Sequence, residues 1–417
     1  MKSKKILIIG LVWPEPDSSA AGTRIIQLIK LLLSENHQLI FASAAGKGPH
    51  SFDLTSLEVT EKAIILNNSS FDTFLQEINP DVVIYDRFVT EEQYGWRIAE
   101  HCPNAITILD TEDLHGLRKA RQKAHKHKEE FNPEAVFSDS VTIREISAIL
   151  RCDLSLIISE TEMQLLLQDF RIDPSLLCYL PFLEEIVRPA DILQWKKYQD
   201  REGFMFIGNF LHEPNWNTVQ ILKTRIWPVL SKILPGVGMH IYGAYCSQKV
   251  TQLHNEKERF YVHGRADDSL GAISKHRILL APILFGAGLK GKLIHAMQTG
   301  TPSVTTTIGA EGMYGDLPWN GFITDDFEDF SQFAAQLYTN QELWTQCRNN
   351  GVAIINERFE KTKSSKTFIS MLQNISANPE QHRRHNFTGT ILRFQTMNST
   401  KYMSLWIEQK NAADQSR

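Results

Sequence analysis

The chain has 417 residues, of which 42% are hydrophobic and 22% are charged, an ordinary globular composition whose length suits two or three domains. Its 44 Lys and Arg against 48 Asp and Glu give a net charge of −4, so nucleic acid is not an expected partner and any anion site must be local. The cysteines lack CxxC spacing, which argues against a zinc site or a disulfide scaffold and predicts reduced, mostly buried thiols. They are Cys102, Cys152, Cys178, Cys246 and Cys347.

The N-terminal segment 1–13 combines lysines with an apolar run, as a signal peptide does. Pro14 follows at once and no small-residue cleavage site is present, so a first buried strand is the better interpretation. No apolar run approaches the roughly 20 residues of a membrane helix. We therefore expect a cytoplasmic protein, and peripheral contact with the inner face of the membrane stays open.

Short apolar, β-branched runs alternate with amphipathic stretches, which is typical of parallel sheets covered by helices. A helix is expected at 23–33, and another begins at Ser159, where Glu162 would complete a capping box. The strands expected in the first half are 5–11, 38–43, 63–66, 81–85, 105–109, 154–158 and 177–180.

The alternation lapses between about 184 and 202 and then restarts, with helices expected at 216–233 and 290–298. The strands expected in the second half are 204–208, 239–242, 260–262, 278–282, 302–306 and 321–324. We therefore predict an α/β fold of two Rossmann-like, doubly wound domains, at 1–190 and 203–378, facing a cleft. A helical tail is predicted at 379–417, with an apolar stripe of Leu392, Phe394, Met397, Tyr402, Leu405 and Trp406. Ligands of such sheets bind at the carboxyl ends of the strands, so the chemistry is expected between the domains.

The strongest local signal lies at 281–292, where a glycine-rich turn with two lysines joins a buried strand to a helix. Gly286 and Gly288 permit close backbone approach, the helix start offers free N–H groups, and Lys290 and Lys292 add positive charge. This pattern predicts a phosphate or diphosphate cradle. The alternative is a tight connection with solvated lysines, which we favour less because turn geometry alone does not require two cations. The spacing is not that of a Walker A loop.

Two further loops follow strands of the second half. The loop at 303–312 contains Glu311, which either accepts hydrogen bonds from a sugar or ribose or caps the next segment. The loop at 208–216 begins with Gly208 and Asn209, and Gly208 again permits close backbone approach.

Taken in order with Gly243, Arg265 and the stretch 294–304, these loops resemble the nucleotide-sugar-binding domain of group 1 glycosyltransferases of the family 4 type. The resemblance covers about 204–313 and is weaker in the first half, where it includes the Gly22 loop and 80–86. It implies the GT-B fold and a retaining, metal-independent transfer of sugar from a nucleotide-diphosphate donor, with no cofactor. The acceptor would be a saccharide or a lipid-linked precursor in cell-surface polysaccharide or glycoconjugate synthesis.

The resemblance also implies residue roles. Gly288, Lys290 and Lys292 would hold the donor diphosphate, with Arg265 near the nucleotide and Gly22 facing the transferred sugar. The complete predicted donor-binding set is Gly22, Gly208, Asn209, Arg265, Gly286, Gly288, Lys290, Lys292, His295 and Glu311.

One departure from the family pattern bears on activity. Many members carry two glutamates separated by seven residues, and here those positions are Ala287 and His295. Ala287 belongs to the Gly-Ala-Gly-x-Lys-Gly-Lys variant that a branch of the family uses, whereas His295 is less expected. A histidine can hydrogen-bond a ribose hydroxyl but does not match a carboxylate that accepts from both hydroxyls. One alternative therefore stays open, a catalytically weak member that acts as an assembly partner. A nucleotide-sugar epimerase of the same fold is a second alternative, for which the loop at 109–118 could supply acidic and basic groups around the sugar ring.

The loop at 109–118 ends a strand at the predicted cleft. The family often places a histidine on an equivalent loop near the sugar, which makes His115 the catalytic candidate, with Asp110 and Asp113 as orienting or acceptor-binding groups. The alternative is that Asp113 caps a helix and His115 is solvated. Asp86 and Arg87 end another strand and are candidate acceptor contacts.

The stretch 118–128 is a strongly basic helix in an acidic chain. It suits anionic lipid headgroups or a lipid-linked diphosphate, although a solvated helix face is the commoner case because apolar anchors are missing. His125 and His127 are two residues apart and point away from each other on a helix, so no metal pair is expected.

Overall fold

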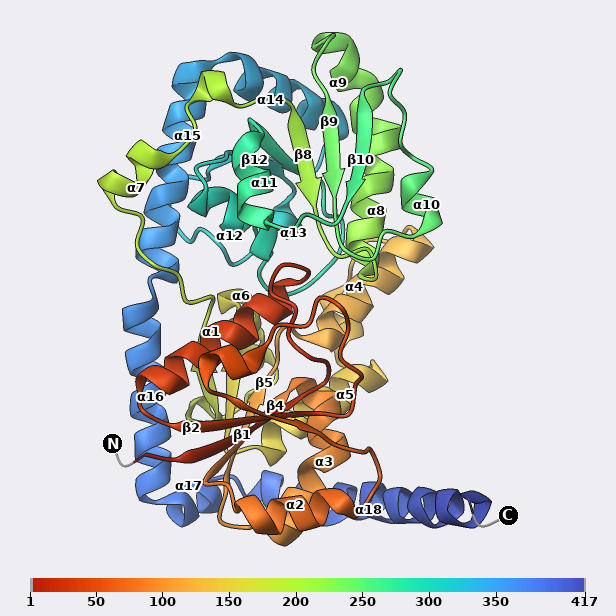
Figure 1. Cartoon of the computed structure of the whole chain (residues 1–417), viewed down its shortest axis with the longest axis vertical. Helices are drawn as coiled ribbons and strands as arrows, with labels where there is room; N and C mark the ends of the chain where they lie inside the picture. The colour runs from red at the N-terminus through yellow and green to blue at the C-terminus, as the bar shows by residue number, and fades with distance from the viewer. Residues whose placement is uncertain (1–2, 416–417) are drawn as a thin grey trace.

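The protein contains two parallel β-sheets, one in each half of the chain, in a computed structural model that describes residues 3–415 (Figure 1). The first sheet has the order β3-β2-β1-β4-β5-β6-β7 and the second the order β10-β9-β8-β11-β12-β13. These are the two doubly wound α/β halves that the sequence predicts.

The strands match the predicted ones closely. The first sheet comprises β1 (Lys5–Gly10), β2 (Gln38–Ser43), β3 (Thr60–Ala63), β4 (Val82–Asp86), β5 (Ile106–Asp110), β6 (Leu154–Ile157) and β7 (Leu177–Tyr179). The second comprises β8 (Phe204–Ile207), β9 (Met239–Tyr242), β10 (Phe260–Gly264), β11 (Ile278–Ala281), β12 (Ser303–Thr305) and β13 (Gly321–Ile323).

Helices cover both faces of each sheet (Figure 1). The first half contains α1 (Ala20–Ser34), α2 (Ser70–Ile78), α3 (Arg87–His101), α4 (His115–His127), α5 (Ser140–Arg151) and α6 (Glu160–Gln164), and α7 (Pro189–Gln194) lies in the connection. The second half contains α8 (Glu213–Ile221), α9 (Trp227–Ile233), α10 (Gln248–Thr251), α11 (Ser269–Lys275), α12 (Gly291–Gln298), α13 (Thr307–Ala310), α14 (Phe327–Thr339) and α15 (Gln341–Ile354). The chain ends in α16 (Lys361–Ala377), α17 (Pro379–His385) and α18 (Phe387–Gln415).

Strands covered on both faces read as unbroken apolar runs, and β1 is the clearest case because Ile6, Leu7, Ile8 and Ile9 are all fully buried. The one misplaced strand is β3, which precedes the predicted 63–66. It is an edge strand with a polar sequence, so the prediction fell on the apolar residues that follow it. Two of them, Ile65 and Leu66, are exposed.

The chain crosses between the halves twice, at Glu184 and at Glu360, where the two crossings pair with each other. Glu184 N donates to Phe359 O at 2.8 Å, and Lys361 N donates to Glu184 O at 3.0 Å. After the second crossing, α16 packs with Phe368 and Leu372 into the core of the first sheet. The predicted second domain, 203–378, thus includes a helix that belongs by packing to the first half.

The predicted helical tail is present, but only part of the predicted stripe packs against the fold, where Leu392, Met397 and Leu405 are half-buried. α18 lies against α3 and α5 and buries Gly389 and Ser404 there. Ion pairs from Arg393 to Asp153 and from Lys401 to Glu100 dock it. Phe394, Tyr402 and Trp406 of the predicted stripe are exposed instead.

No helix within residues 3–415 is both long enough and apolar enough to cross a bilayer.

The packing of α16 generates a prediction on stability. Phe368 is fully buried on α16, whereas Phe394 on α18 is 75% exposed. Phe368→Ala should lower the free energy of unfolding by about 3–5 kcal/mol, because it leaves a cavity in the first core. The matched Phe394→Ala should change it by no more than about 0.5 kcal/mol. Urea unfolding of both variants measures this, and equal midpoints would contradict the assignment of α16 to that core.

Candidate active site

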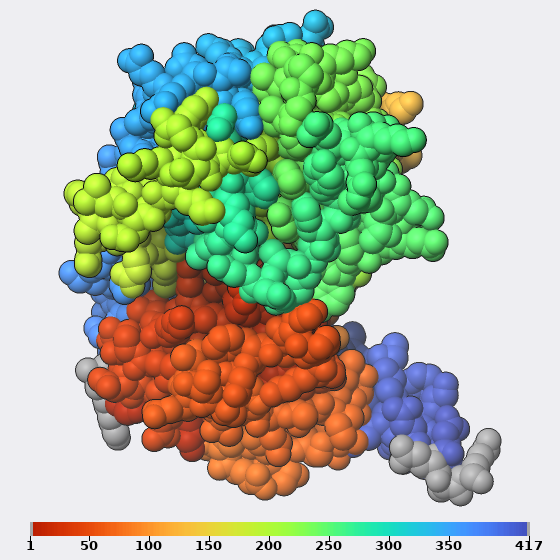
Figure 2. All heavy atoms as spheres, turned by 45° about the horizontal axis from the view of Figure 1, so that its top comes forward, coloured from red at the N-terminus to blue at the C-terminus, as the bar shows by residue number. Residues whose placement is uncertain are grey.

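A cavity of about 570 Å³ lies between the two halves, at the carboxyl ends of both sheets. Figure 2 shows the seam along which the red N-terminal half meets the green and teal C-terminal half. The first half contributes the segments 11–12, 16–21 and 112–113, together with Arg87, His115 and Arg118, while the second half contributes mainly 207–209 and 285–292. This volume suits a small-molecule substrate.

The glycine-rich loop 286–292 forms one wall of the cavity. Gly288 has a φ of 62°, and a Cβ there would lie 2.8 Å from Cβ of Asp113 across the seam, so a larger residue does not fit. α12 begins at Gly291, within this segment, so its first N–H groups are close to the cavity. The loop therefore brings backbone of the second half against the first half.

The two lysines of this loop lie in the cavity wall, where Lys290 is buried and Lys292 is half-buried. Lys290 Nζ donates to Gly288 O at 2.7 Å, and Lys292 Nζ donates to Asn215 Oδ1 at 2.9 Å. Burial lowers the pKa of both ammonium groups, and burial together with Lys290 lowers the pKa of Lys292 to about 8. A buried cation whose hydrogen-bond partner is a neutral amide is costly, and an anionic ligand in the cavity would offset that cost.

Glu162 joins this loop to the first half. Its Oε1 accepts hydrogen bonds from Gly288 N at 2.8 Å and from Leu114 N at 3.0 Å. Its Oε2 is buried without a hydrogen-bond partner, and burial, with Asp113 nearby, raises its pKa to about 8.

The predicted capping box at Ser159 is therefore wrong, because Glu162 turns to the seam and Ser159 makes no side-chain cap. The sequence signal for the contact at the seam is the position of Glu162 after strand β6, at the same sheet edge as Asp113.

His115 lies in the cavity wall and is held by a buried carboxylate. His115 Nδ1 is 3.2 Å from Glu145 Oε1, and Glu145 also accepts hydrogen bonds from the backbone N–H groups of His115 and Gly116. In the described part of the chain, the ring's Nε2 has no hydrogen-bond partner. The imidazole is thus oriented by Glu145, which sequence reasoning missed because it lies 30 residues away on α5.

The two aspartates predicted beside His115 have different surroundings. Asp110 is fully buried below the cavity, where Arg24 Nη2 donates to its Oδ1 at 2.7 Å. Asp113 lines the cavity, and Arg118 Nη1 donates to both of its carboxylate oxygens, at 2.9 and 2.8 Å. Asp113 does not cap α4, whose first turn follows Leu114. The ring of His115 is thus oriented by Glu145 and also by Asp113, whose backbone O is 3.1 Å and whose Oδ1 is 3.5 Å from Nδ1. Any role of the aspartates in catalysis stays a prediction.

The structure brings seven of the predicted donor-binding residues into the cavity wall and leaves three outside it. Those in the wall are Gly208, Asn209, Gly286, Gly288, Lys290, Lys292 and His295. Gly22 packs so tightly that a Cβ would lie 2.4 Å from the backbone of Glu15. Arg265 pairs with Asp267, at 3.0 Å, and Glu311 is bound by Arg121. The roles of these three residues in donor binding stay predictions.

The basic helix α4 connects the two halves, so neither a lipid surface nor solvent alone accounts for its charges (Figure 1). Arg121 donates to both carboxylate oxygens of Glu311, each at 2.7 Å, and to Gly286 O at 2.9 Å. Lys126 pairs with Glu213 at 3.0 Å, and the ring of His125 stacks on Phe285. Arg121 thus stabilises the glycine-rich loop through its hydrogen bond to Gly286 O. Contact of α4 with a membrane stays a prediction.

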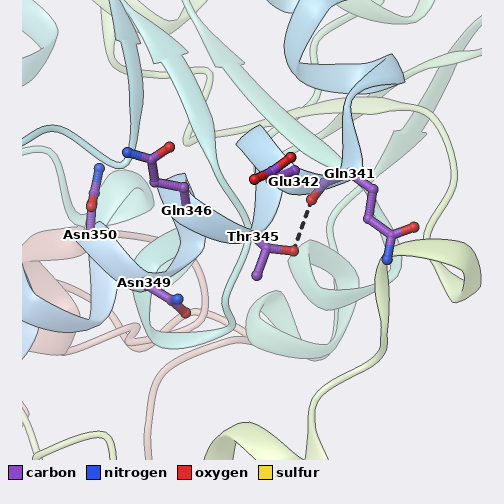
Figure 3. Close-up of a pocket in the computed structure, with 6 residues that line it drawn as sticks. All are labelled: Gln341, Glu342, Thr345, Gln346, Asn349 and Asn350. Carbon is purple, nitrogen blue, oxygen red and sulfur yellow. Dashed lines mark hydrogen bonds between the residues drawn. The ribbon is translucent and has the colours of Figure 1, made fainter.

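A second hollow, on the surface of α15, does not form a binding site. Figure 3 shows its six lining side chains, all from α15: Gln341, Glu342, Thr345, Gln346, Asn349 and Asn350. Because they come from successive turns of one helix, they do not converge on a ligand.

Among the residues that the structure describes, no group of three or more His, Cys, Asp or Glu side chains is arranged to hold a metal ion.

The raised pKa of Glu162 generates a prediction on pH and stability. Its folded pKa of about 8 exceeds the ordinary value of 4.5, so the native state binds more protons than the unfolded state between these values. Stability should therefore fall as pH rises from 5 to 8. Glu162→Gln keeps the acceptor oxygen but cannot ionise. Between pH 5 and pH 8 the variant should therefore lose less free energy of unfolding than the wild type, by more than about 1 kcal/mol.

Denaturant unfolding at pH 5 and pH 8 measures this difference. The exposed Glu380→Gln is the control, and it should behave as the wild type does. An equal loss of stability in wild type and Glu162→Gln would contradict the assignment.

Comparison with known proteins agrees with this geometry. Residues 201–340 match the family model described as glycosyl transferases group 1. No curated protein sequence matches the chain.

Solved structures share the fold at low identity. HepE of Anabaena, in complex with UDP and glucose, matches with a TM-score of 0.66 at 13% identity, covering 89% of this chain and 100% of HepE. Sucrose-phosphate synthase of Thermosynechococcus elongatus matches with a TM-score of 0.64 at 12% identity, over 90% of this chain and 100% of that chain.

A single-site mutant of S. aureus TarM, in a complex that includes UDP, matches with a TM-score of 0.55 at 14% identity, and the match spans 72% of this chain but only 57% of TarM. At these identities the likeness establishes the fold. Residues 201–340 are thus similar to group 1 glycosyltransferases, and the chain as a whole has the GT-B fold.

Proposed function

We propose that the protein transfers a sugar from a nucleoside-diphosphate donor to a saccharide or lipid-linked acceptor, with retention of configuration and without a metal ion. The observation that carries this proposal is the pair of lysines in the cavity wall at the start of α12, the buried Lys290 and the half-buried Lys292. HepE and TarM, which share the fold, were crystallised with UDP, which supports a uridine nucleotide as the first donor to try.

The lysines suit the chemistry of the leaving group. A departing nucleoside diphosphate gains negative charge as the glycosidic bond breaks, and cations fixed in advance stabilise that charge most in the transition state. They supply the positive charge that a metal ion supplies in other phosphate sites, which supports a metal-independent reaction.

His295 suits contact with the ribose or the sugar. It lines the cavity one turn after Lys292, and burial, with Lys292 nearby, lowers its pKa to about 4. The ring is therefore neutral at physiological pH and offers one donor and one acceptor to hydroxyl groups.

His115 lies across the seam from the lysines, on the first half. Its Nε2 has no hydrogen-bond partner among the described residues while Glu145 contacts Nδ1, so the ring is suited to a hydrogen bond with the transferred sugar or the incoming hydroxyl. Retention is the part of the proposal that rests on the family resemblance, and the anomeric configuration of the product, read by NMR, tests it. Synthesis of a cell-surface polysaccharide or glycoconjugate is likewise proposed from the family.

The two lysines generate a prediction on affinity. Isothermal titration calorimetry with UDP, GDP, ADP and dTDP should detect binding of at least one nucleotide. Lys292→Met should weaken that binding about 10- to 150-fold, because a charge-assisted hydrogen bond contributes about 1.5–3 kcal/mol. The exposed Lys257→Met, also in the second half, should bind as the wild type does. Absence of binding by all four nucleotides, or unchanged affinity in Lys292→Met, would contradict the proposal.

The lowered pKa of Lys292 generates a second prediction. Because that pKa is about 8 in the free protein, the ammonium group loses its proton as pH rises from 7 to 9, and affinity for the diphosphate should fall over this range. Lys292→Arg keeps its charge and should flatten the fall. Calorimetry at pH 8.5 in buffers of different ionisation enthalpy should show proton uptake in the wild type, and its absence would rule out Lys292 as the titrating contact.

A further inference from the structure

The first-half wall of the cavity contains two residues in left-handed backbone. Arg87 has a φ of 70° and Glu112 a φ of 63°, values that residues with a Cβ rarely adopt. Arg87 directly follows β4, Glu112 follows β5, and these two strands pair in register with Asp86 beside Asp110. Two adjacent strand ends are thus strained where they meet the cavity, and such strain is concentrated at functional sites.

Arg87 differs from the other arginines around the seam in having no hydrogen-bonded carboxylate. Arg24, Arg118 and Arg121 each donate to both oxygens of one carboxylate. Within residues 3–415 the guanidinium of Arg87 makes no hydrogen bond, and the nearest carboxylate oxygen, Asp86 Oδ1, is 3.7 Å from its Nε. Its planar set of five N–H donors is therefore available to a ligand, although the side chain is only 18% exposed.

Glu112 adds a second unsatisfied group to the same wall. Its Oε1 is buried without a hydrogen-bond partner. Burial, with Asp110 nearby, raises its pKa to about 8, so at neutral pH the carboxyl group is protonated. In that state it does not neutralise Arg87, and it can donate a hydrogen bond to a ligand oxygen.

The lysines that suit the donor diphosphate line the cavity from the second half of the chain, whereas Arg87 lines it from the first half, which leaves Arg87 on the wall available to the acceptor. A guanidinium fork matches the paired oxygens of a phosphate or carboxylate, and a sugar hydroxyl uses it less fully. We propose that Arg87, with Glu112 beside it, forms an acceptor subsite that selects an acceptor bearing an oxyanion, either a phosphate or a carboxylate. This inference rests on the proposed function, since it assumes that the other half of the cavity holds the donor.

The test uses the full chain saturated with the nucleoside diphosphate that binds it. Glucose 6-phosphate, glucuronate and glucose share a ring and differ at C6, and each is titrated by calorimetry. At least one of the two anions should bind tenfold or more tightly than glucose. Arg87→Gln should remove that preference and leave affinity for the nucleotide unchanged, while the exposed Arg384→Gln should alter neither. The response to the two anions shows which oxyanion the subsite takes.

Arg87→Gly guards against a loss of binding through misfolding. Glycine adopts a φ of 70° without strain, so this variant should melt no lower than the wild type and should also lose the preference for anions. Equal affinity for glucose and both anions, or unchanged anion affinity in Arg87→Gln and Arg87→Gly, would overturn the inference. Absence of nucleotide binding would instead contradict the proposed function. The same titrations on the free protein would then show whether Arg87 makes the two anions bind more tightly than glucose.

Discussion

The site depends on one buried carboxylate at the seam between the halves. Glu162 accepts a hydrogen bond from Gly288 in the glycine-rich loop and another from Leu114, directly before His115. These two hydrogen bonds fix the position of one half of the chain relative to the other. The lysines and the imidazole therefore line the same cavity. Arg121 of α4 supports the loop from the other side, through Gly286 O and Glu311. The geometry of the cavity is thus set by polar contacts across the seam, and the two hydrophobic cores of the halves need only position the strand ends.

The charged groups around the cavity fall into two classes, those with a hydrogen-bonded partner of opposite charge and those without one. Asp110, Asp113 and Glu311 each accept hydrogen bonds from an arginine on both carboxylate oxygens. Lys292, by contrast, is half-buried against a neutral amide, and Arg87 makes no hydrogen bond in the described residues, although Asp86 Oδ1 is 3.7 Å from its Nε. An unpaired buried cation destabilises the folded chain unless an anion joins it. Lys292 and Arg87, which lack a hydrogen-bonded carboxylate, line the cavity from opposite halves of the chain.

Much of the fold follows from local pattern, whereas part of the site does not. The buried parallel strands can be predicted from their apolar runs. The loop that contains Gly286 and Gly288 predicts a phosphate or diphosphate site from its glycines and lysines. Edge strand β3 was misplaced because edges carry no such run. Glu162 and Glu145 were missed because their partners lie 126 and 30 residues away, and a short-range capping pattern offered Glu162 a local explanation. The pairing of Glu311 with Arg121 spans 190 residues and depends on how the halves meet.

The central claim is that the cavity breaks the bond between a sugar and a nucleoside diphosphate. The most direct measurement is chromatography with mass spectrometry of the full chain incubated with UDP-, GDP-, ADP- and dTDP-sugars. We expect that one donor is consumed and yields free nucleoside diphosphate, with the sugar transferred to an added acceptor or slowly to water. An unchanged set of donors would contradict it, and so would a nucleotide sugar isomerised with its diphosphate bond to the sugar intact.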